Sequence, residues 1–558
     1  MKKKSPGLLL IALFLVFLAF VLFNPGKRFI KSVLLEEFLE RNFEPVTGIF
    51  HGEEIKPGTL KHYSLIWKDT GIWLNRTILS EKIQQENVLL TIETWSGNNE
   101  NVLEETLSGK FDQKVEELAK ILSQSPKQIY IRWNPDMEVP VSEFPWQYQS
   151  PELYIKSFNY FASKFKRLAP RVKIVWGPSG YPGDTEYWPG SENVDLLSIT
   201  LGSISEKKAV NYPFSDQNPA ELLRQKLHRM RFMNKAVIIL GSEKINPSNF
   251  RGKWIGQIDS LFFKYRKNIY PPADFAVTDR PKLFARKELK LGVYDPAKLL
   301  INEPGITTEH IFTDLGEVQN GLFEKKFTEI TARKHDVIVT MEPWRDTTGR
   351  ADPDPLNHLL AGRYDQEISR LFKVLYQTNQ TVYLRFAHEM EIPIHRYPWQ
   401  SQDPLTYIRA FRYFMQSDTK RAKNIRKVWG PAGDRGSVDW WPGNDVVDFI
   451  SIAIYGLPDK NIEDHKKQEA FSTIFRRKVY RMRFLDKPIF ITEFGVKGPE
   501  QYQKIWLEDA AGILRENKQV FGASYFNLHD NPKAWGKIEA PDWSISRKTF
   551  GYFYRRLP

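Results

Sequence analysis

The chain contains a long internal repeat, which constrains its architecture more than any other feature. Arg224–Ile239 returns in the second half as Arg476–Ile491. Shorter segments return in the same order: Phe144–Gln147 as Tyr397–Gln400, Val175–Pro178 as Val428–Pro431, and Trp188–Gly190 as Trp441–Gly443. The repeat is far longer than the units of about 20 to 50 residues that build solenoids. It therefore predicts a duplicated domain.

Within the second copy, short β-rich runs alternate with amphipathic segments such as Tyr364–Tyr376 and Tyr407–Met415. Strands are expected at Leu291–Tyr294, Val337–Met341, Val382–Phe386, Lys427–Trp429, Phe449–Ala453, Ile489–Thr492 and Ala523–Asn527. Such alternation over about 250 residues is typical of a parallel sheet closed into a (β/α)8 barrel. The predicted fold class is α/β, with two tandem (β/α)8 TIM-type barrels at residues 29–280 and 285–558.

The N-terminal segment, residues 1–28, is predicted to be a transmembrane helix that acts as a membrane anchor. Lys2–Lys4 precede an apolar run from Gly7 to Phe23. The leading positive charge favours a cytoplasmic N-terminus with both barrels outside the cytoplasm, in the periplasm or at the cell surface. Because the run is shorter than the about 20 residues of a typical span, a cleaved signal peptide is the alternative. The bulky Phe20 and Phe23 at the expected cleavage position favour an anchor.

The composition excludes several classes of function. The net charge of +13 comes from 80 basic and 67 acidic residues that are interleaved along the chain. No basic stripe, phosphate loop or zinc pattern is present, so no nucleic-acid partner is expected. The absence of cysteine excludes disulfides, thiolate metal sites and thiol nucleophiles, and no metal or cofactor is expected. The 16 Trp residues suit a protein that stacks aromatic rings on its ligand.

Two glutamates follow predicted strands of the second copy. Thr381–Phe386 leads into His388 and Glu389, and Lys487–Thr492 leads into Glu493. Functional residues of a (β/α)8 barrel lie at the carboxyl ends of its strands. A surface position or a helix N-terminus would explain either acid alone. Two carboxylates that converge on one pocket are the minimum apparatus for cleaving a glycosidic bond.

The second copy resembles glycoside hydrolase family 26, which includes β-mannanases and mixed-linkage glucanases. Eight segments carry the resemblance in order: Gly292–Tyr294, Val339–Trp344, Ala361–Asp365, Arg385–Met390, Tyr397–Trp399, Asn424–Trp429, Trp441–Gly443 and Lys487–Gly495. The resemblance implies a retaining, endo-acting hydrolase with Glu389 as the acid/base and Glu493 as the nucleophile. It also implies that His388 contacts the sugar and that Tyr455 donates a hydrogen bond to the nucleophile.

Further residues of the second copy are expected to bind the substrate. Trp344, Trp399 and Trp535 are candidates for stacking platforms or subsite walls. For Trp429, Trp440 and Trp441, packing at a strand end is at least as good an interpretation as substrate binding. Arg385 shares strand parity with Glu389 and is expected on the same side, where it either holds an acid or fills a buried ion-pair network.

The second copy departs from the family pattern at two places. Glu391–Pro393 stands where the family usually has Asn and Gly, and Ile452–Ile454 stands where the family commonly carries an Asp. These differences leave the reaction class intact and leave the mannan preference unsupported.

The first copy lacks the predicted catalytic residues. Pro135 and Asp136 align with His388 and Glu389, and Gly241 aligns with the nucleophile. Because a retaining mechanism requires a nucleophile, the first copy is predicted to be catalytically inactive. Glu243 is not expected to substitute. Binding of sugar and a purely structural role remain open for the tryptophans that this copy keeps, Trp95, Trp133, Trp146 and Trp188.

The sequence therefore predicts a membrane-anchored glycoside hydrolase. Its substrate is expected to be a β-mannan or β-glucan type of polysaccharide, with an exopolysaccharide exported by the same cell as one candidate. The alternative is a membrane-tethered, non-catalytic protein that binds polysaccharide or assists exopolysaccharide assembly.

Overall fold

The chain divides into two compact units, Met1–Tyr265 and Arg266–Pro558. The computed structural model describes residues 46–50, 59–68, 74–95, 101–201, 209, 219–241, 286, 288–345, 352–393, 396–456, 469–532 and 539–558. The predicted anchor at residues 1–28 and Trp535 lie outside this range. Within the described part, no helix combines the length and apolar composition needed to cross a membrane.

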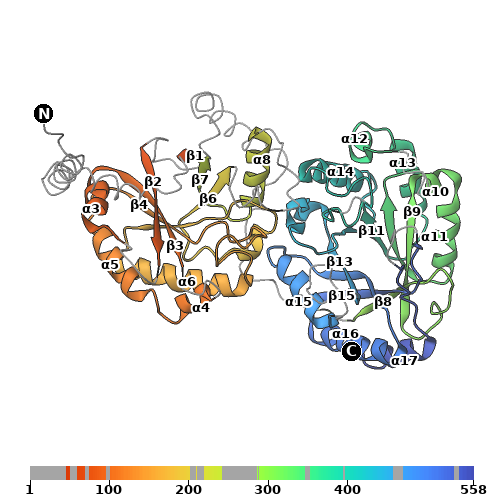
Figure 1. The fold of residues 1–558 in the computed structure, drawn as a ribbon. Helices are drawn as coiled ribbons and strands as arrows, with labels where there is room; N and C mark the ends of the chain where they lie inside the picture. The colour runs from red at the N-terminus through yellow and green to blue at the C-terminus, as the bar shows by residue number, and fades with distance from the viewer. Residues whose placement is uncertain are drawn as a thin grey trace, which may run out of the picture. The chain divides into compact units, whose positions relative to one another are not determined.

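The second unit contains a closed barrel of eight parallel strands, drawn in green to blue in Figure 1. In order of pairing these are β10 (Asp336–Glu342), β11 (Val382–Phe386), β12 (Ile425–Trp429), β13 (Phe449–Gly456), β14 (Ile489–Val496), β15 (Val520–Phe526), β8 (Lys290–Tyr294) and β9 (Ile306–Asp314). The predicted TIM-type barrel is thus confirmed for this copy.

Helices surround the barrel of the second unit. They are α10 (Leu315–Asn320), α11 (Leu322–Ala332), α12 (Pro355–Leu360), α13 (Asp365–Leu375), α14 (Pro404–Gln416), α15 (Phe471–Arg481), α16 (Glu500–Glu516) and α17 (Arg547–Tyr554). Helix α14 shows how the sequence sets such an element. The Asp403 side chain caps its N-terminus by accepting from Thr406 N at 3.1 Å, and Pro404 occupies the first turn. Its buried Phe414 stacks on Phe386 of β11, with ring centroids 4.3 Å apart.

The interior of this barrel is apolar at the bottom and polar above. Ile338, Tyr383 and Phe490 belong to one buried hydrophobic cluster. Two residues further along the strands lie Thr340, Arg385 and Thr492, which are also buried. Residues two apart on a strand face the same side, so the alternation carries polar groups up the inside of the barrel. The next positions lead to the carboxyl ends of the strands, where the candidate site lies.

The first unit contains a seven-stranded sheet, drawn in red to yellow in Figure 1. The strand order is β1 (Val46–Phe50), β7 (Val237–Gly241), β6 (Leu196–Leu201), β5 (Lys173–Trp176), β4 (Ile129–Trp133), β3 (Asn87–Thr94) and β2 (Leu60–Trp67). The described helices are α3 (Arg76–Gln85), α4 (Val102–Leu107), α5 (Asp112–Leu122), α6 (Pro151–Leu168) and α8 (Pro219–Met230).

The prediction of a closed eight-stranded barrel for the first unit is not met by its described residues. Strands β2 to β7 run parallel, as in the second unit, but β1 pairs with β7 in the antiparallel direction. In the second unit the corresponding edge of β14 is covered by the parallel strand β15, which then pairs with β8. An antiparallel β1 at this edge leaves the described strands as an open sheet.

Candidate active site

Glu493 lies in β14, near the carboxyl end of the strand, and is held by two donors. Its side chain forms an ion pair with Arg385 through Oε1. The hydroxyl of Tyr455, from the end of β13, donates to Oε2 at 2.8 Å. Burial and the charge of Glu493 raise the pKa of Tyr455 well above its usual value, so the phenol keeps the proton that it donates. These contacts hold the Glu493 carboxylate in place.

Arg385, on β11, lies beneath the two glutamates and is 1% exposed. It connects β11 to β10 and β14. Its Nε donates to Thr340 Oγ1 at 2.9 Å, and its Nη1 donates to Thr492 Oγ1 at 2.8 Å. Register shifts in β14 allow the consecutive residues Thr492 and Glu493 both to reach the guanidinium. Gly430 makes room for it, because a Cβ there would lie 2.5 Å from Arg385 Cδ. Of the two interpretations that the sequence leaves open, the structure thus favours Arg385 as the partner of a candidate acid.

Glu389 follows β11 on a tight turn, with φ at +54°. Its backbone N–H donates to Gly430 O at 2.8 Å, and its carbonyl accepts from Gln400 Nε2 at 3.1 Å. Ala387 also has a positive φ, of +44°, so strand parity with Arg385 does not extend to Glu389 and the turn sets its position. Desolvation, together with the negative charge of Glu493, raises the pKa of Glu389 to about 7.

His388 is buried beside the candidate acid/base. Burial, reinforced by the positive charge of Arg385, lowers the pKa of His388 well below its usual value, so the ring is neutral. Its Nδ1 has no hydrogen-bond partner among the described residues. Its carbonyl accepts from Trp399 Nε1 at 2.8 Å. The imidazole therefore retains unused hydrogen-bonding capacity at Nδ1.

Two of the tryptophans predicted to bind sugar, Trp344 and Trp399, pack in a cluster with Tyr397. The rings of Tyr397 and Trp399 stack with centroids 4.6 Å apart, and Trp344 lies edge-on to Trp399 at 5.0 Å. Trp344 and Trp399 are 4% and 0% exposed, so in this structure they support the loop and do not present open faces for stacking. Trp429 and Trp441 are also buried and meet edge to face, in agreement with packing at a strand end.

A third acid, Glu342, lies at the end of β10 and was missed by the sequence reasoning. Its Oε2 accepts from Trp344 Nε1 at 3.0 Å. Burial, with smaller contributions from neighbouring acids such as Glu493, raises the pKa of Glu342 to about 8. The signal was present in the sequence, because Glu342 follows a predicted hydrophobic strand, as the two candidate catalytic glutamates do. Among the described residues, no cluster of histidine and acidic side chains is arranged to hold a metal ion.

The first unit retains the frame of this site but has no carboxylate at the position of Glu493. Asp136 has a φ of +57° and donates its N–H to Gly177 O at 2.9 Å, as Glu389 does to Gly430 O. The Trp146 indole donates to Pro135 O at 2.7 Å, as Trp399 does to His388 O. Gly241 ends β7 in the place that Glu493 takes in β14. Glu243 lies outside the described residues.

Comparison with known proteins identifies glycoside hydrolases as relatives. No family model matches the chain. A β-1,3-xylanase from a Vibrio species is 28% identical over 151 residues, which cover 25% of this chain and 28% of that protein. A β-1,3-xylanase from an Alcaligenes species is 25% identical over 195 residues, or 32% of this chain and 38% of the relative. Endoglucanase H of Acetivibrio thermocellus is 25% identical over 223 residues, which cover 38% of this chain and 23% of that protein.

The resemblance to glycoside hydrolases expected from the motifs is thereby confirmed. The alignments span between about a quarter and two fifths of the length of these relatives. Among solved structures, the family 26 β-mannanase of Bacteroides ovatus matches 48% of this chain and 89% of its own, with a TM-score of 0.35 and 14% identity. A modular endo-β-1,4-mannanase of Cellulomonas fimi matches 48% and 71%, with a TM-score of 0.36 and 13% identity.

Proposed function

We propose that the second unit is a retaining, endo-acting glycoside hydrolase that cleaves a β-linked polysaccharide. The observation that carries the proposal is the unequal environment of two acids at one end of the barrel. Glu493 receives hydrogen bonds from Arg385 and Tyr455, whereas the pKa of Glu389 is raised to about 7. One acid is thus suited to attack and the other to carry a proton.

In the first step, the Glu493 carboxylate attacks the anomeric carbon of the bound sugar. As the bond to the leaving oxygen breaks, Glu389 transfers its proton to that oxygen, and a glycosyl ester of Glu493 remains. Tyr455 and Arg385 hold the carboxylate in place for the attack. The family resemblance implies that the neutral His388 bonds a sugar hydroxyl in this step.

In the second step, Glu389 removes a proton from water, which attacks the anomeric carbon and releases Glu493. The charge of Glu493 is one cause of the raised pKa of Glu389. Ester formation removes that charge, so the pKa of Glu389 falls in the intermediate. The same residue is therefore better suited to act as an acid in the first step and as a base in the second.

The mechanism is tested by the stereochemistry of the product. We expect 1H NMR to show the β-anomer first, because two displacements retain the configuration. With an activated aryl glycoside, azide should rescue Glu389→Ala to a β-glycosyl azide and Glu493→Ala to an α-glycosyl azide. Initial release of the α-anomer by the unmodified enzyme would show an inverting reaction. In a crystal structure, carboxyl groups about 5 to 5.5 Å apart would support retention, and about 6.5 to 9.5 Å would support inversion.

The substrate is proposed as a neutral β-glycan of the mannan, glucan or xylan type. The named relatives are β-1,3-xylanases and an endoglucanase, and the motifs of the second unit resemble a family of mannanases and mixed-linkage glucanases. The detergent-solubilised full chain should be assayed on β-mannan, mixed-linkage glucan, cellulose, β-1,4-xylan and β-1,3-xylan. A fall in viscosity that precedes the release of reducing ends would support endo-action.

A non-catalytic role in polysaccharide binding is the second candidate, and one observation favours it for the first unit. Trp95 and Phe144, whose ring centroids lie 5.9 Å apart, are only partly buried, unlike Trp344 and Trp399 of the second unit, so the first unit keeps aromatic faces that a sugar could contact. Affinity electrophoresis of Glu493→Ala and of its Trp95→Ala double variant tests this role. Weaker retention by a glycan in the double variant supports binding by the first unit, and equal retention contradicts it.

Membrane attachment through residues 1–28 is also proposed, with both units outside the cytoplasm. It rests on the lysines and the apolar run of the sequence. The protein should fractionate with membranes, and protease added to intact cells or spheroplasts should release it. A mature N-terminus near residue 25 in the soluble fraction would instead show a cleaved signal peptide.

A further inference from the structure

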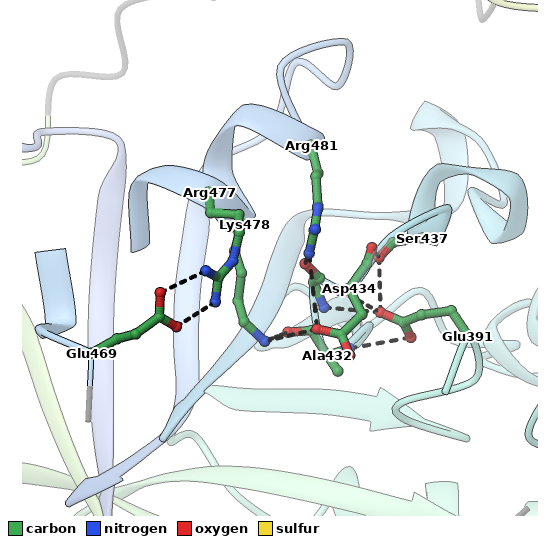
Figure 2. A network of polar contacts seen from close by, with 9 residues as sticks. Glu391, Ala432, Asp434, Ser437, Glu469, Arg477, Lys478 and Arg481 are labelled. Carbon is green, nitrogen blue, oxygen red and sulfur yellow. Dashed lines mark hydrogen bonds and ion pairs between the residues drawn. The ribbon is translucent and has the colours of Figure 1, made fainter. Parts of the chain in front are cut away.

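Glu391 lies two residues after the candidate acid/base and is 5% exposed. Its Oε1 accepts from the backbone N–H of Gly433 at 2.9 Å and of Asp434 at 3.0 Å, and from Ser437 Oγ at 2.8 Å. Figure 2 shows the carboxylate pointing into this segment. A carboxylate so well supplied with donors fixes the segment after β12 against the turn that carries Glu389.

The same two segments are joined at a second point. Glu389 donates its own N–H to Gly430 O at 2.8 Å, just before the residues that Glu391 holds. The φ of Glu389 is positive, a backbone conformation that residues other than glycine seldom adopt. Contacts on both sides of Met390 therefore maintain the turn, with Gly430 on one side and residues 433–437 on the other.

Basic residues of α15 hold the far side of this segment. Lys478 Nζ donates to Ala432 O at 2.7 Å and lies 3.4 Å from Asp434 Oδ1. Arg481 Nη1 donates to Gly433 O at 3.2 Å (Figure 2). The segment is thus held between Glu391 and α15, and displacement of Glu391 would leave the turn of Glu389 without this support.

We propose that Glu391 is a positioning residue for Glu389, acting both through the segment that it holds and through its negative charge. This inference rests on the proposed function of Glu389 as the acid/base. The charge of Glu391 is among the causes that raise the pKa of Glu389, after desolvation and Glu493, while Arg396 and Arg385 lower it. Burial, followed by the charge of Asp434, raises the pKa of Glu391 itself, so this effect is largest at pH values where Glu391 is ionised.

The first unit supplies a matched control. Glu138 accepts from Gly180 N at 2.9 Å and from Tyr181 N at 3.0 Å, and Lys226 donates to Ser179 O at 2.7 Å. This repeats the arrangement around Glu391. A change at Glu138 thus reports how the loss of such a buried carboxylate affects the folding of a unit, without affecting Glu389.

The test compares Glu391→Gln, Glu391→Asp and Glu138→Gln in the full chain. We expect Glu391→Gln to lower kcat by about tenfold to a hundredfold, with little change in KM, because the acid/base is displaced slightly. The basic limb of its kcat/KM profile should move to lower pH, because a negative charge near Glu389 is lost. Glu391→Asp should restore the limb, even if kcat stays low. Glu138→Gln should leave kcat and the profile unchanged.

A measurement that needs no turnover separates this inference from the proposed function. The carboxylic C=O band of Glu389, assigned by its loss in Glu389→Gln, is titrated by infrared spectroscopy. We expect the titration midpoint of this band to lie at lower pH in Glu391→Gln than in the unmodified protein. In Glu391→Asp the midpoint should lie close to that of the unmodified protein. An unchanged midpoint and an unchanged kcat in both Glu391 variants would overturn the inference. Full activity of Glu389→Ala would overturn the proposed function instead.

Discussion

In the first unit, Arg132 forms an ion pair with Asp136, with 3.2 Å between Arg132 Nη2 and Asp136 Oδ1. In the second unit, the equivalent Arg385 pairs with Glu493. Gly241, at the position of Glu493, has no side chain, and Arg132 pairs instead with Asp136, at the position of Glu389. Asp136 is also shorter than a glutamate, and we propose that both differences oppose catalysis in the first unit.

The first prediction concerns the division of labour between the units. Glu493→Ala should abolish turnover, and Glu389→Ala should reduce it by about a hundredfold to ten-thousandfold on an unactivated glycan, the usual contribution of a general acid. Asp136→Ala and Glu243→Ala should change kcat little. Initial rates on the best glycan of the panel provide the measurement. A loss in Asp136→Ala as large as that in Glu389→Ala would show that the first unit is active.

The second prediction concerns the pH profile. Glu389 must be protonated to act as the acid, and its raised pKa of about 7 belongs to the free enzyme. The basic limb of kcat/KM should therefore fall as the pH rises through about 7. An aryl glycoside with a good leaving group needs less help from the acid, so its profile should stay flatter on this side. Equally steep basic limbs for both substrates would contradict the assignment.

The comparison of sequence with structure shows which parts of the fold a residue pattern can predict. Seven barrel strands of the second unit follow from hydrophobic runs, but β9 was missed. Its sequence contains Thr308, Glu309 and His310, which interrupt the apolar pattern although all three are buried. The antiparallel pairing of β1 in the first unit was also missed. The direction in which a strand pairs depends on the path of the chain, which strand propensity does not report.

The candidate site was predictable to a similar degree. Glu389 and Glu493 follow from the rule that barrel chemistry lies at the strand ends. The ion-pair partner of Arg385 was left open, because the register shifts that bring Thr492 and Glu493 to the guanidinium cannot be read from alternation. The position of Glu389 likewise depends on a turn with positive φ, which could not be predicted from the sequence of this turn.

The third prediction concerns the buried ion pair. Arg385→Ala leaves the Glu493 carboxylate buried without its cation, which should destabilise the second unit by about 3–5 kcal/mol. Arg385→Ala combined with Glu493→Gln removes the unpaired charge and should recover part of that loss. The unfolding transition of the second unit, followed by denaturant titration of the full chain, provides the comparison. A double variant less stable than Arg385→Ala would show that the charge is not the cause.

The last prediction concerns Glu342, the buried acid at the end of β10. Its pKa is raised from 4.5 to about 8 in the folded state, so between these values the folded protein binds a proton that the unfolded chain has lost. Its contribution to stability is therefore fully present below about pH 4.5 and is lost as the pH rises through about 8.

Glu342→Gln cannot titrate, and its amide oxygen can still accept from Trp344 Nε1. We expect the melting temperature of the variant, relative to that of the unmodified protein, to rise between pH 5 and pH 9, where the comparison should be made. The exposed Glu516→Gln serves as the control and should show no such trend. An equal difference in melting temperature at both pH values would mean that Glu342 titrates in the folded protein as it does in the unfolded chain.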